Sequence, residues 1–201
     1  MKPYQQGAID YFCGVYAVIN AFRHAARGRA ELLSYTDGCA FYQYLITRLI
    51  KFGRFEEVLR HGTDAELLEK LLKKADGYVR RAYGLKIDFS APYADTDKDV
   101  LTAVEEIGKF LKQDGTAWLL RMNNKSLGDH WSVATTVYSN GKVALFDSYG
   151  AKSFDANKAV WTPPVKEKDR TPDNPSGMPI PPRGKTMLLK EGQFLIAVSP
   201  A

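Results

Sequence analysis

The fold is decided by one stretch near the start of the chain, which reads Gln5-Gln6-Gly7-Ala8-Ile9-Asp10-Tyr11-Phe12-Cys13-Gly14-Val15-Tyr16-Ala17-Val18-Ile19-Asn20-Ala21-Phe22. A polar approach that contains glycine leads into a cysteine, and a long apolar segment follows at once. This pattern predicts a buried helix from about Cys13 to Ala26, with the thiol in its first turn. First-turn N–H groups lack partners inside the helix, and the positive end of the helix dipole lies there. Both effects favour the thiolate, which is the nucleophilic form of cysteine.

A lone buried cysteine is usually a small hydrophobic residue, so two later segments decide whether this one is a nucleophile. His130 opens one predicted strand and Asp147 closes the next. Between them lies Asn140-Gly141, and Asn-Gly is the strongest short signal for a β-hairpin. Cysteine, histidine and aspartate in this order are the nucleophile, base and orienting group of a thiol hydrolase.

The hairpin also makes a geometric demand. A two-residue turn at Asn-Gly pairs Ala134 with Asp147, and strand periodicity puts His130 on the face of Ala134. His130 and Asp147 then share a face but are offset by four residues, roughly 13 Å at ~3.3 Å per residue. Twist, a bulge or a shifted register must close this gap. If none does, Asp129 or an amide elsewhere is the orienting group.

A developing oxyanion needs hydrogen-bond donors beside the nucleophile. The backbone N–H of Cys13 is one candidate. The side-chain amide of Gln6, seven residues upstream, is the natural second donor, and Gln5 is the alternative.

The order of the expected elements is helices first and antiparallel strands second, which indicates an α+β fold. Helices are expected over 13–26, over 38–52, from a capping box at Thr63 and Glu66 to Gly77, and over 99–113. Strands are expected over 85–90, 116–122, 130–138, 142–148 and 193–198. Residues 162–184 hold seven prolines and are expected to form a loop.

Length and composition indicate one globular domain over residues 1–201, since 45% of the residues are hydrophobic and eleven are tyrosine. The net charge is +5, but the basic residues are spread over predicted helix faces and loops, so no nucleic-acid partner is expected. Three histidines and two cysteines, none at ligand spacing, predict no metal site and no cofactor. A bridge between Cys13 and Cys39 would abolish the nucleophile and does not suit a reducing compartment.

No apolar run approaches the ~18 residues that a membrane helix needs, and the start of the chain lacks the apolar core of a signal peptide. A soluble, cytoplasmic protein without a membrane partner is therefore expected. Secretion as an effector without a cleaved signal is the alternative.

The combination of Gln6, Cys13-Gly14, a following apolar helix, His130-Trp131 on a strand and Asp147 resembles the papain-like cysteine peptidases. Within them the chain is most similar to the compact group of bacteriocin-processing (double-glycine) peptidases. It also resembles phytochelatin synthase, a transpeptidase of that superfamily, at Cys13-Gly14 and Asn20-Ala21. These families usually place the glutamine six residues before the cysteine, where this chain has Gly7, so Gln6 requires one extra residue in the turn.

The resemblance implies a hydrolase that cleaves a peptide or isopeptide bond of a peptide or protein substrate. Cys13 would attack the carbonyl, His130 would carry the proton, and Asp147 would orient the imidazole. The same triad would serve a transpeptidase, transglutaminase or deamidase. A catalytically silent binding module on the same scaffold is the remaining alternative.

Overall fold

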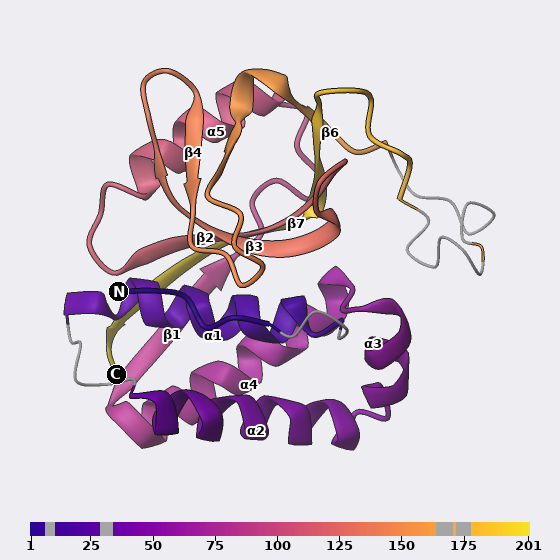
Figure 1. Ribbon diagram of the computed structural model, residues 1–201. Helices are drawn as coiled ribbons and strands as arrows, with labels where there is room; N and C mark the ends of the chain where they lie inside the picture. Colours follow the sequence, from indigo (N-terminus) through magenta and orange to yellow (C-terminus); the bar gives the residue numbers. More distant parts are fainter. Residues whose placement is uncertain (7–10, 29–33, 164–170, 172–177) are drawn as a thin grey trace.

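The computed structural model describes residues 1–6, 11–28, 34–163, 171 and 178–201. Four helices come first along the chain and form a layer: α1 (Cys13–Ala25), α2 (Tyr35–Lys51), α3 (Phe55–His61) and α4 (Ala65–Tyr83). The sheet follows, with a fifth helix, α5 (Val100–Phe110), on its far side (Figure 1). The α+β prediction is confirmed.

The sheet has seven strands in the order β1-β7-β2-β3-β4-β5, and β6 also pairs with β7. Their bounds are β1 (Leu85–Ser90), β2 (Thr116–Asn124), β3 (Gly128–Val137), β4 (Lys142–Leu145), β5 (Ser153–Asp155), β6 (Ala159–Trp161) and β7 (Thr186–Pro200). All these pairings are antiparallel except that of β6 with β7. Alternate side chains along the strands enter two different cores, as the two-residue period of a strand requires.

The first core lies between the sheet and the helical layer. It joins the apolar face of α1 to residues such as Leu119, Trp131 and Ile196 of the sheet. The second core lies beneath α5 and takes the intervening residues, such as Trp118 and Leu120. Helix α1 is therefore buried on most of its surface, as its apolar sequence predicts.

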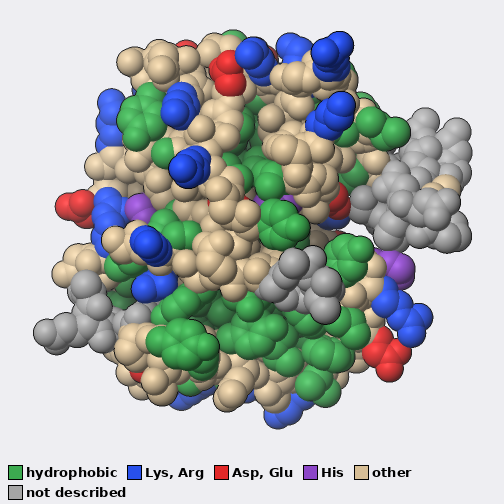
Figure 2. Space-filling view, in the orientation of Figure 1, with side chains coloured by type: hydrophobic (Ala, Val, Ile, Leu, Met, Phe, Trp, Pro, Cys, Tyr) green, Lys and Arg blue, Asp and Glu red, His purple; other side chains and the backbone are tan. Residues whose placement is uncertain are grey.

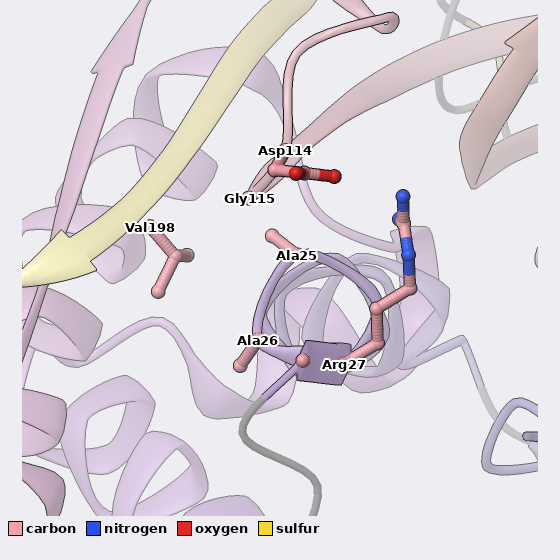
Figure 3. A pocket seen from close by; sticks show the side chains of 7 residues that line it. Ala25, Ala26, Arg27, Asp114, Gly115 and Val198 are labelled. Carbon is pink, nitrogen blue, oxygen red and sulfur yellow. The ribbon is translucent and has the colours of Figure 1, made fainter.

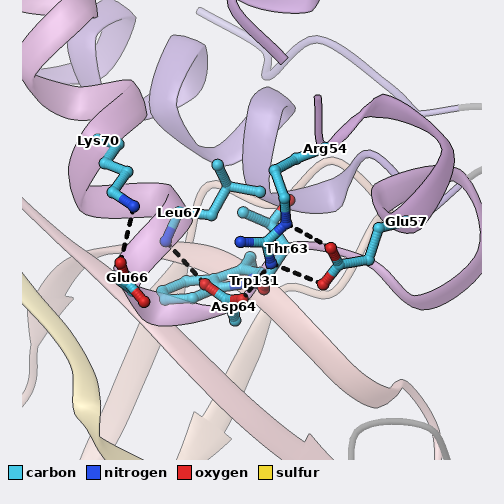
Figure 4. A network of polar contacts seen from close by, with 8 residues as sticks. All are labelled: Arg54, Glu57, Thr63, Asp64, Glu66, Leu67, Lys70 and Trp131. Atoms are coloured by element: carbon cyan, nitrogen blue, oxygen red, sulfur yellow. Dashed lines mark hydrogen bonds and ion pairs between the residues drawn. The ribbon is translucent and has the colours of Figure 1, made fainter. Parts of the chain in front are cut away.

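The predicted start and end of the third helix are wrong. The residue that caps α4 is Asp64, whose carboxylate accepts the N–H of Leu67 at 2.7 Å (Figure 4). The helix also continues through Gly77 to Tyr83 and ends at Gly84, which adopts a left-handed conformation. One glycine inside a helix costs only about 1 kcal/mol, which the buried stripe that continues to Val79 outweighs.

Other boundaries also differ from the prediction. Helix α2 begins at Tyr35 rather than at residue 38, because Ser34 and Asp37 form a capping box. Helix α3 and the short strands β5 and β6 were not predicted, and β7 extends well beyond 193–198. The strand over 85–90 is confirmed, and most of the proline-rich segment lies outside the described residues.

The turn between β3 and β4 is longer than the two residues predicted. The N–H of Tyr138 donates to the carbonyl of Lys142 at 2.9 Å, and Gly141 closes the loop with a φ of 80°. The register then shifts between Ala134 and Thr136, and Ala134 pairs with Leu145 instead of Asp147. A longer loop followed by a bulge thus moves the end of β4 two residues closer to the start of β3.

This shift halves the predicted gap between His130 and Asp147. The N–H of Phe146 donates to the carbonyl of Val133 at 2.7 Å, so Asp147 follows directly at the level of Ser132. His130 is two residues from Ser132, on the same face of β3. The offset between His130 and Asp147 is therefore two residues instead of four.

Among the described residues, none of the helices combines the length and apolar character that crossing a membrane requires.

Candidate active site

Cys13 is the first residue of α1 and is 9% exposed. Phe12 precedes it as the N-cap residue and makes no side-chain cap hydrogen bond. Gly14 lets the α3–α4 loop approach closely, because a Cβ at this position would lie 2.8 Å from the Thr63 side chain. The sequence pattern that predicted Cys13 at a helix start is confirmed.

Aromatic rings surround this helix start. Phe12 stacks on Phe55 of α3 with ring centroids 5.7 Å apart and meets Tyr42 of α2 edge-on at 6.5 Å. Tyr16 contacts Tyr42 at 5.3 Å. Figure 2 shows how strongly hydrophobic side chains are concentrated over the helical layer. These contacts fix the first turn of α1, and with it the position of Cys13, against α2 and α3.

The structure brings His130 and Asp147 together. His130 Nε2 lies 2.7 Å from Asp147 Oδ2, and both side chains are buried. The Cys13 side chain also lies close enough to the His130 ring to raise the pKa of that ring. Because Nε2 hydrogen-bonds to the carboxylate, only Nδ1 can exchange a proton with the thiol. The ring therefore lies beside both the carboxylate and the sulfur.

The contacts around the ring change its pKa. Burial lowers the pKa of His130, but the hydrogen bond to Asp147 and the nearby Cys13 side chain outweigh this effect and raise it to about 10. Burial raises the pKa of Asp147, but the bond with His130 and the contact with Ser132 outweigh it and hold this pKa below its usual value. At neutral pH the pair is an imidazolium beside a carboxylate.

The second oxygen of Asp147 is held by the backbone that follows it. Oδ1 accepts the N–H of Tyr149 at 2.8 Å and the N–H of Ala151 at 3.1 Å. The loop after β4 thus fixes the carboxylate, which leaves Oδ2 to orient His130.

Asp129, the alternative orienting group, has a different partner. Arg121 on β2 donates to both of its oxygens, at 2.8 and 2.6 Å. The Arg121 guanidinium lies 5.9 Å from the centre of the Trp131 ring. Trp131 in turn donates its Nε1–H to the carbonyl of Thr63 at 2.7 Å, where the sheet meets the α3–α4 loop (Figure 4). These contacts were not predicted from the sequence, because no local sequence pattern links Arg121, Trp131 and Thr63.

The two candidate oxyanion glutamines lie beside the loop that holds Asp147. The N–H of Gln6 donates to the carbonyl of Ser148 at 3.0 Å. The side-chain Nε2 of Gln5 donates to the carbonyl of Asp147 at 3.4 Å. The amide of Gln5 is thus directed at the backbone.

The other cysteine and histidines lie elsewhere. Cys39 is half-buried in the first half of α2 beside Tyr35. His24 is in the last turn of α1 against Phe146, and burial and Arg27 lower its pKa to about 4. In the part of the chain that the structure describes, no group of three or more His, Cys, Asp or Glu side chains is placed to hold a metal ion.

A separate cavity of about 330 Å³ lies at the opposite end of α1. Ala25, Ala26, Gly115 and Val198 form much of its wall, and Arg27 and Asp114 extend on one side of it (Figure 3). Twelve residues of helix, ~18 Å at ~1.5 Å per residue, separate Ala25 from Cys13. The cavity is therefore remote from the thiol.

No family model matches this chain, and no curated protein is significantly similar to it in sequence.

Proposed function

We propose that the chain is a papain-like thiol hydrolase that cleaves a peptide or isopeptide bond through Cys13, His130 and Asp147. The observation that carries the proposal is the His130 ring, which bonds to Asp147 through Nε2 and lies close to Cys13. This is the arrangement that a nucleophile, a general base and an orienting carboxylate require.

In the proposed reaction the thiol proton of Cys13 already resides on Nδ1 of His130, so the resting pair is a thiolate beside an imidazolium. The sulfur attacks the carbonyl carbon, and the N–H of Cys13 and the amide of Gln6 stabilise the oxyanion. His130 then gives the proton to the leaving amine as the C–N bond breaks, which leaves a thioester. Water, deprotonated by His130, attacks the thioester, the carboxylic acid is released, and the thiolate–imidazolium pair is restored.

The buried ring supports each of these proton transfers. Because the Asp147 carboxylate accepts the hydrogen bond from Nε2–H, Nδ1 is the ring nitrogen that can exchange a proton with the sulfur. Imidazolium beside Cys13 stabilises a thiolate by charge, and a thiolate is the attacking species. The helix dipole acts in the same direction.

The test is the pH dependence of iodoacetamide alkylation, resolved by site with mass spectrometry. Cys13 should react much faster than Cys39 at neutral pH, and His130→Ala should remove this advantage while Cys39 keeps its own rate. Cys39 is half-buried whereas Cys13 is buried, so exposure alone predicts the opposite order.

The same proteins, not treated with iodoacetamide, are incubated with a mixture of unrelated peptides. Cleavage that disappears in Cys13→Ala and His130→Ala supports hydrolysis. A Cys13 that reacts no faster than Cys39 and ignores His130 would contradict the proposal and leave a binding scaffold.

A further inference from the structure

Asn20 is a polar residue in the middle of a buried helix. It is 0% exposed, and its side chain bonds twice to the backbone of Tyr4. Its Oδ1 accepts the N–H of Tyr4 at 2.9 Å, and its Nδ2 donates to the carbonyl of Tyr4 at 3.1 Å. A buried amide is costly unless both its groups are bonded. Here the two bonds satisfy the side chain and hold the N-terminal segment, residues 4–6, against α1.

Other contacts fix the same point of the segment. The Tyr4 hydroxyl donates to the carbonyl of Ser34 at 2.7 Å, and the guanidinium of Arg23 lies 4.1 Å from the centre of the Tyr4 ring. The ring lies so close to Gly38 of α2 that a Cβ there would overlap it. Tyr4 is thus seated between α1 and α2.

From Tyr4 the chain runs antiparallel to α1 toward the start of that helix (Figure 1). Asn20 and Cys13 are seven residues apart, about 10 Å along the helix axis. Tyr4 and Gln6 are two residues apart, about 7 Å of extended chain. The remaining ~3 Å is within the length of a glutamine side chain. The anchored segment thus brings the Gln6 amide to the level of the Cys13 thiol.

The far end of the segment is bound to the other half of the site. The N–H of Gln6 donates to the carbonyl of Ser148, the residue after Asp147. One short segment therefore touches α1 through Asn20 and the Asp147 loop through Gln6.

We propose that Asn20 is a positioning residue of the active site. It holds the N-terminal segment so that the amide of Gln6 meets the oxyanion formed at Cys13. The inference rests on the proposed function. It implies that acyl transfer depends on Asn20, whereas the nucleophilicity of the thiol does not, because the contacts of Cys13 with His130 do not involve the segment.

Two reactions of the Cys13 sulfur measure acyl transfer and thiol nucleophilicity separately. Alkylation by iodoacetamide forms no oxyanion, whereas acetylation by p-nitrophenyl acetate passes through one. The rates are followed by mass spectrometry of Cys13 and by release of p-nitrophenol. Asn20→Ala should lower the acetylation rate on the order of 10- to 100-fold, somewhat less than loss of an oxyanion donor itself. Its alkylation rate should stay within about twofold of wild type.

Four further variants complete the test. Gln6→Ala should show the same split between the two reactions, and Gln5→Ala should show little change in either. The double variant Asn20→Ala/Gln6→Ala should be no slower in acetylation than Gln6→Ala alone, because residues that act through one group are not additive. Tyr4→Phe, which keeps both backbone bonds to Asn20, should retain most of the activity. Thermal unfolding shows whether each variant is folded.

The inference is overturned if Asn20→Ala slows both reactions equally, slows neither, or adds its full effect to that of Gln6→Ala. If Asn20→Ala does not fold, Gln6→Ala and Asn20→Ser decide, since the shorter serine weakens the hold on Tyr4 with less loss of packing. An unreactive Cys13 in the wild type would overturn the proposed function, and this inference with it. A reactive Cys13 whose acetylation ignores Asn20 overturns this inference alone.

Discussion

At the scale of single residues, the candidate site depends on which partner each ring nitrogen of His130 has. Nε2 bonds to Asp147, and Cys13 lies close enough to the ring to raise its pKa. The carboxylate and the sulfur both favour the imidazolium. The ring therefore keeps its proton well above the pH at which an ordinary histidine loses it.

Replacing Asp147 by asparagine should lower the pKa of His130 from about 10, because the hydrogen bond to the carboxylate is the largest effect that raises it. An NMR titration of the labelled histidine rings measures this change. His24, whose pKa is about 4 and whose contacts are with Arg27 and Phe146, is an internal reference in the same spectra. A His130 titration that is the same in both proteins would contradict the assigned contact.

The raised pKa of His130 makes the free energy of unfolding depend on pH. Since the folded pKa of His130 is above its unfolded value of ~6.5, its stabilising effect is complete below pH ~6.5 and is lost as the pH rises through about 10. The free energy of unfolding should decline over that window in the wild type and decline less in Asp147→Asn.

The sequence predicted Cys13, His130 and Asp147 because each lies at the boundary of a recognisable element. It could not predict the spacing of His130 and Asp147, since the bulge between Ala134 and Thr136 has no distinctive sequence. Contacts between segments that are far apart in the chain could not be predicted from the sequence either. Trp131 and Thr63 are 68 residues apart in the chain and meet only in the folded molecule.

At the scale of elements, two glycines in helices have opposite roles. Gly14 in α1 lies against Thr63, whereas the nearest atom to a Cβ at Gly77 in α4 is the end of the Arg81 side chain, at 3.6 Å. The sequence suggested that Gly77 ends a helix. The structure shows that the helix tolerates Gly77 and that Gly14 is required for the approach of the α3–α4 loop.

Gly77→Ala should raise the free energy of unfolding by about 0.5–1 kcal/mol, because alanine favours a helix and the site has room. Gly14→Ala makes the same chemical change but places a Cβ 2.8 Å from Thr63. It should lower the free energy of unfolding by about 1–3 kcal/mol, as overpacking does. Urea unfolding compares the two variants directly. A stabilising Gly14→Ala would contradict the close contact.

Helix and strand types could be predicted because they follow hydrophobic periods, but ends depend on individual contacts. Thr63 and Asp64 are adjacent and both suit a helix cap, and only the fold selects Asp64. Strand β6 has three residues and is held by its pairing with the start of β7, so its own sequence carries too little signal.

At the scale of the whole molecule, the sheet and the helical layer meet mainly through apolar contacts, and the Trp131–Thr63 hydrogen bond is a buried polar contact between them. Trp131→Phe keeps an aromatic ring but leaves the Thr63 carbonyl without its donor. It should lower the free energy of unfolding by about 1–3 kcal/mol.

Trp161 is a matched control, because its Nε1–H donates to the carbonyl of Lys98 at 2.8 Å in an exposed setting. Trp161→Phe should cost less than Trp131→Phe, since water can replace the lost donor. Equal losses in the two variants, measured by urea unfolding, would contradict the role assigned to Trp131.

The central position of β7 affects how the molecule is made. Strands β1, β2 and β6 all border β7 and all precede it in the chain. Between Thr116, where β2 begins, and Thr186, where β7 begins, the ribosome adds about 70 residues, which takes roughly 4–14 s at ~5–20 residues per second. Throughout that interval one edge of β2 has no partner strand, and unpaired edges invite association with other chains. The nascent chain is therefore most vulnerable to aggregation during synthesis, before β7 has emerged.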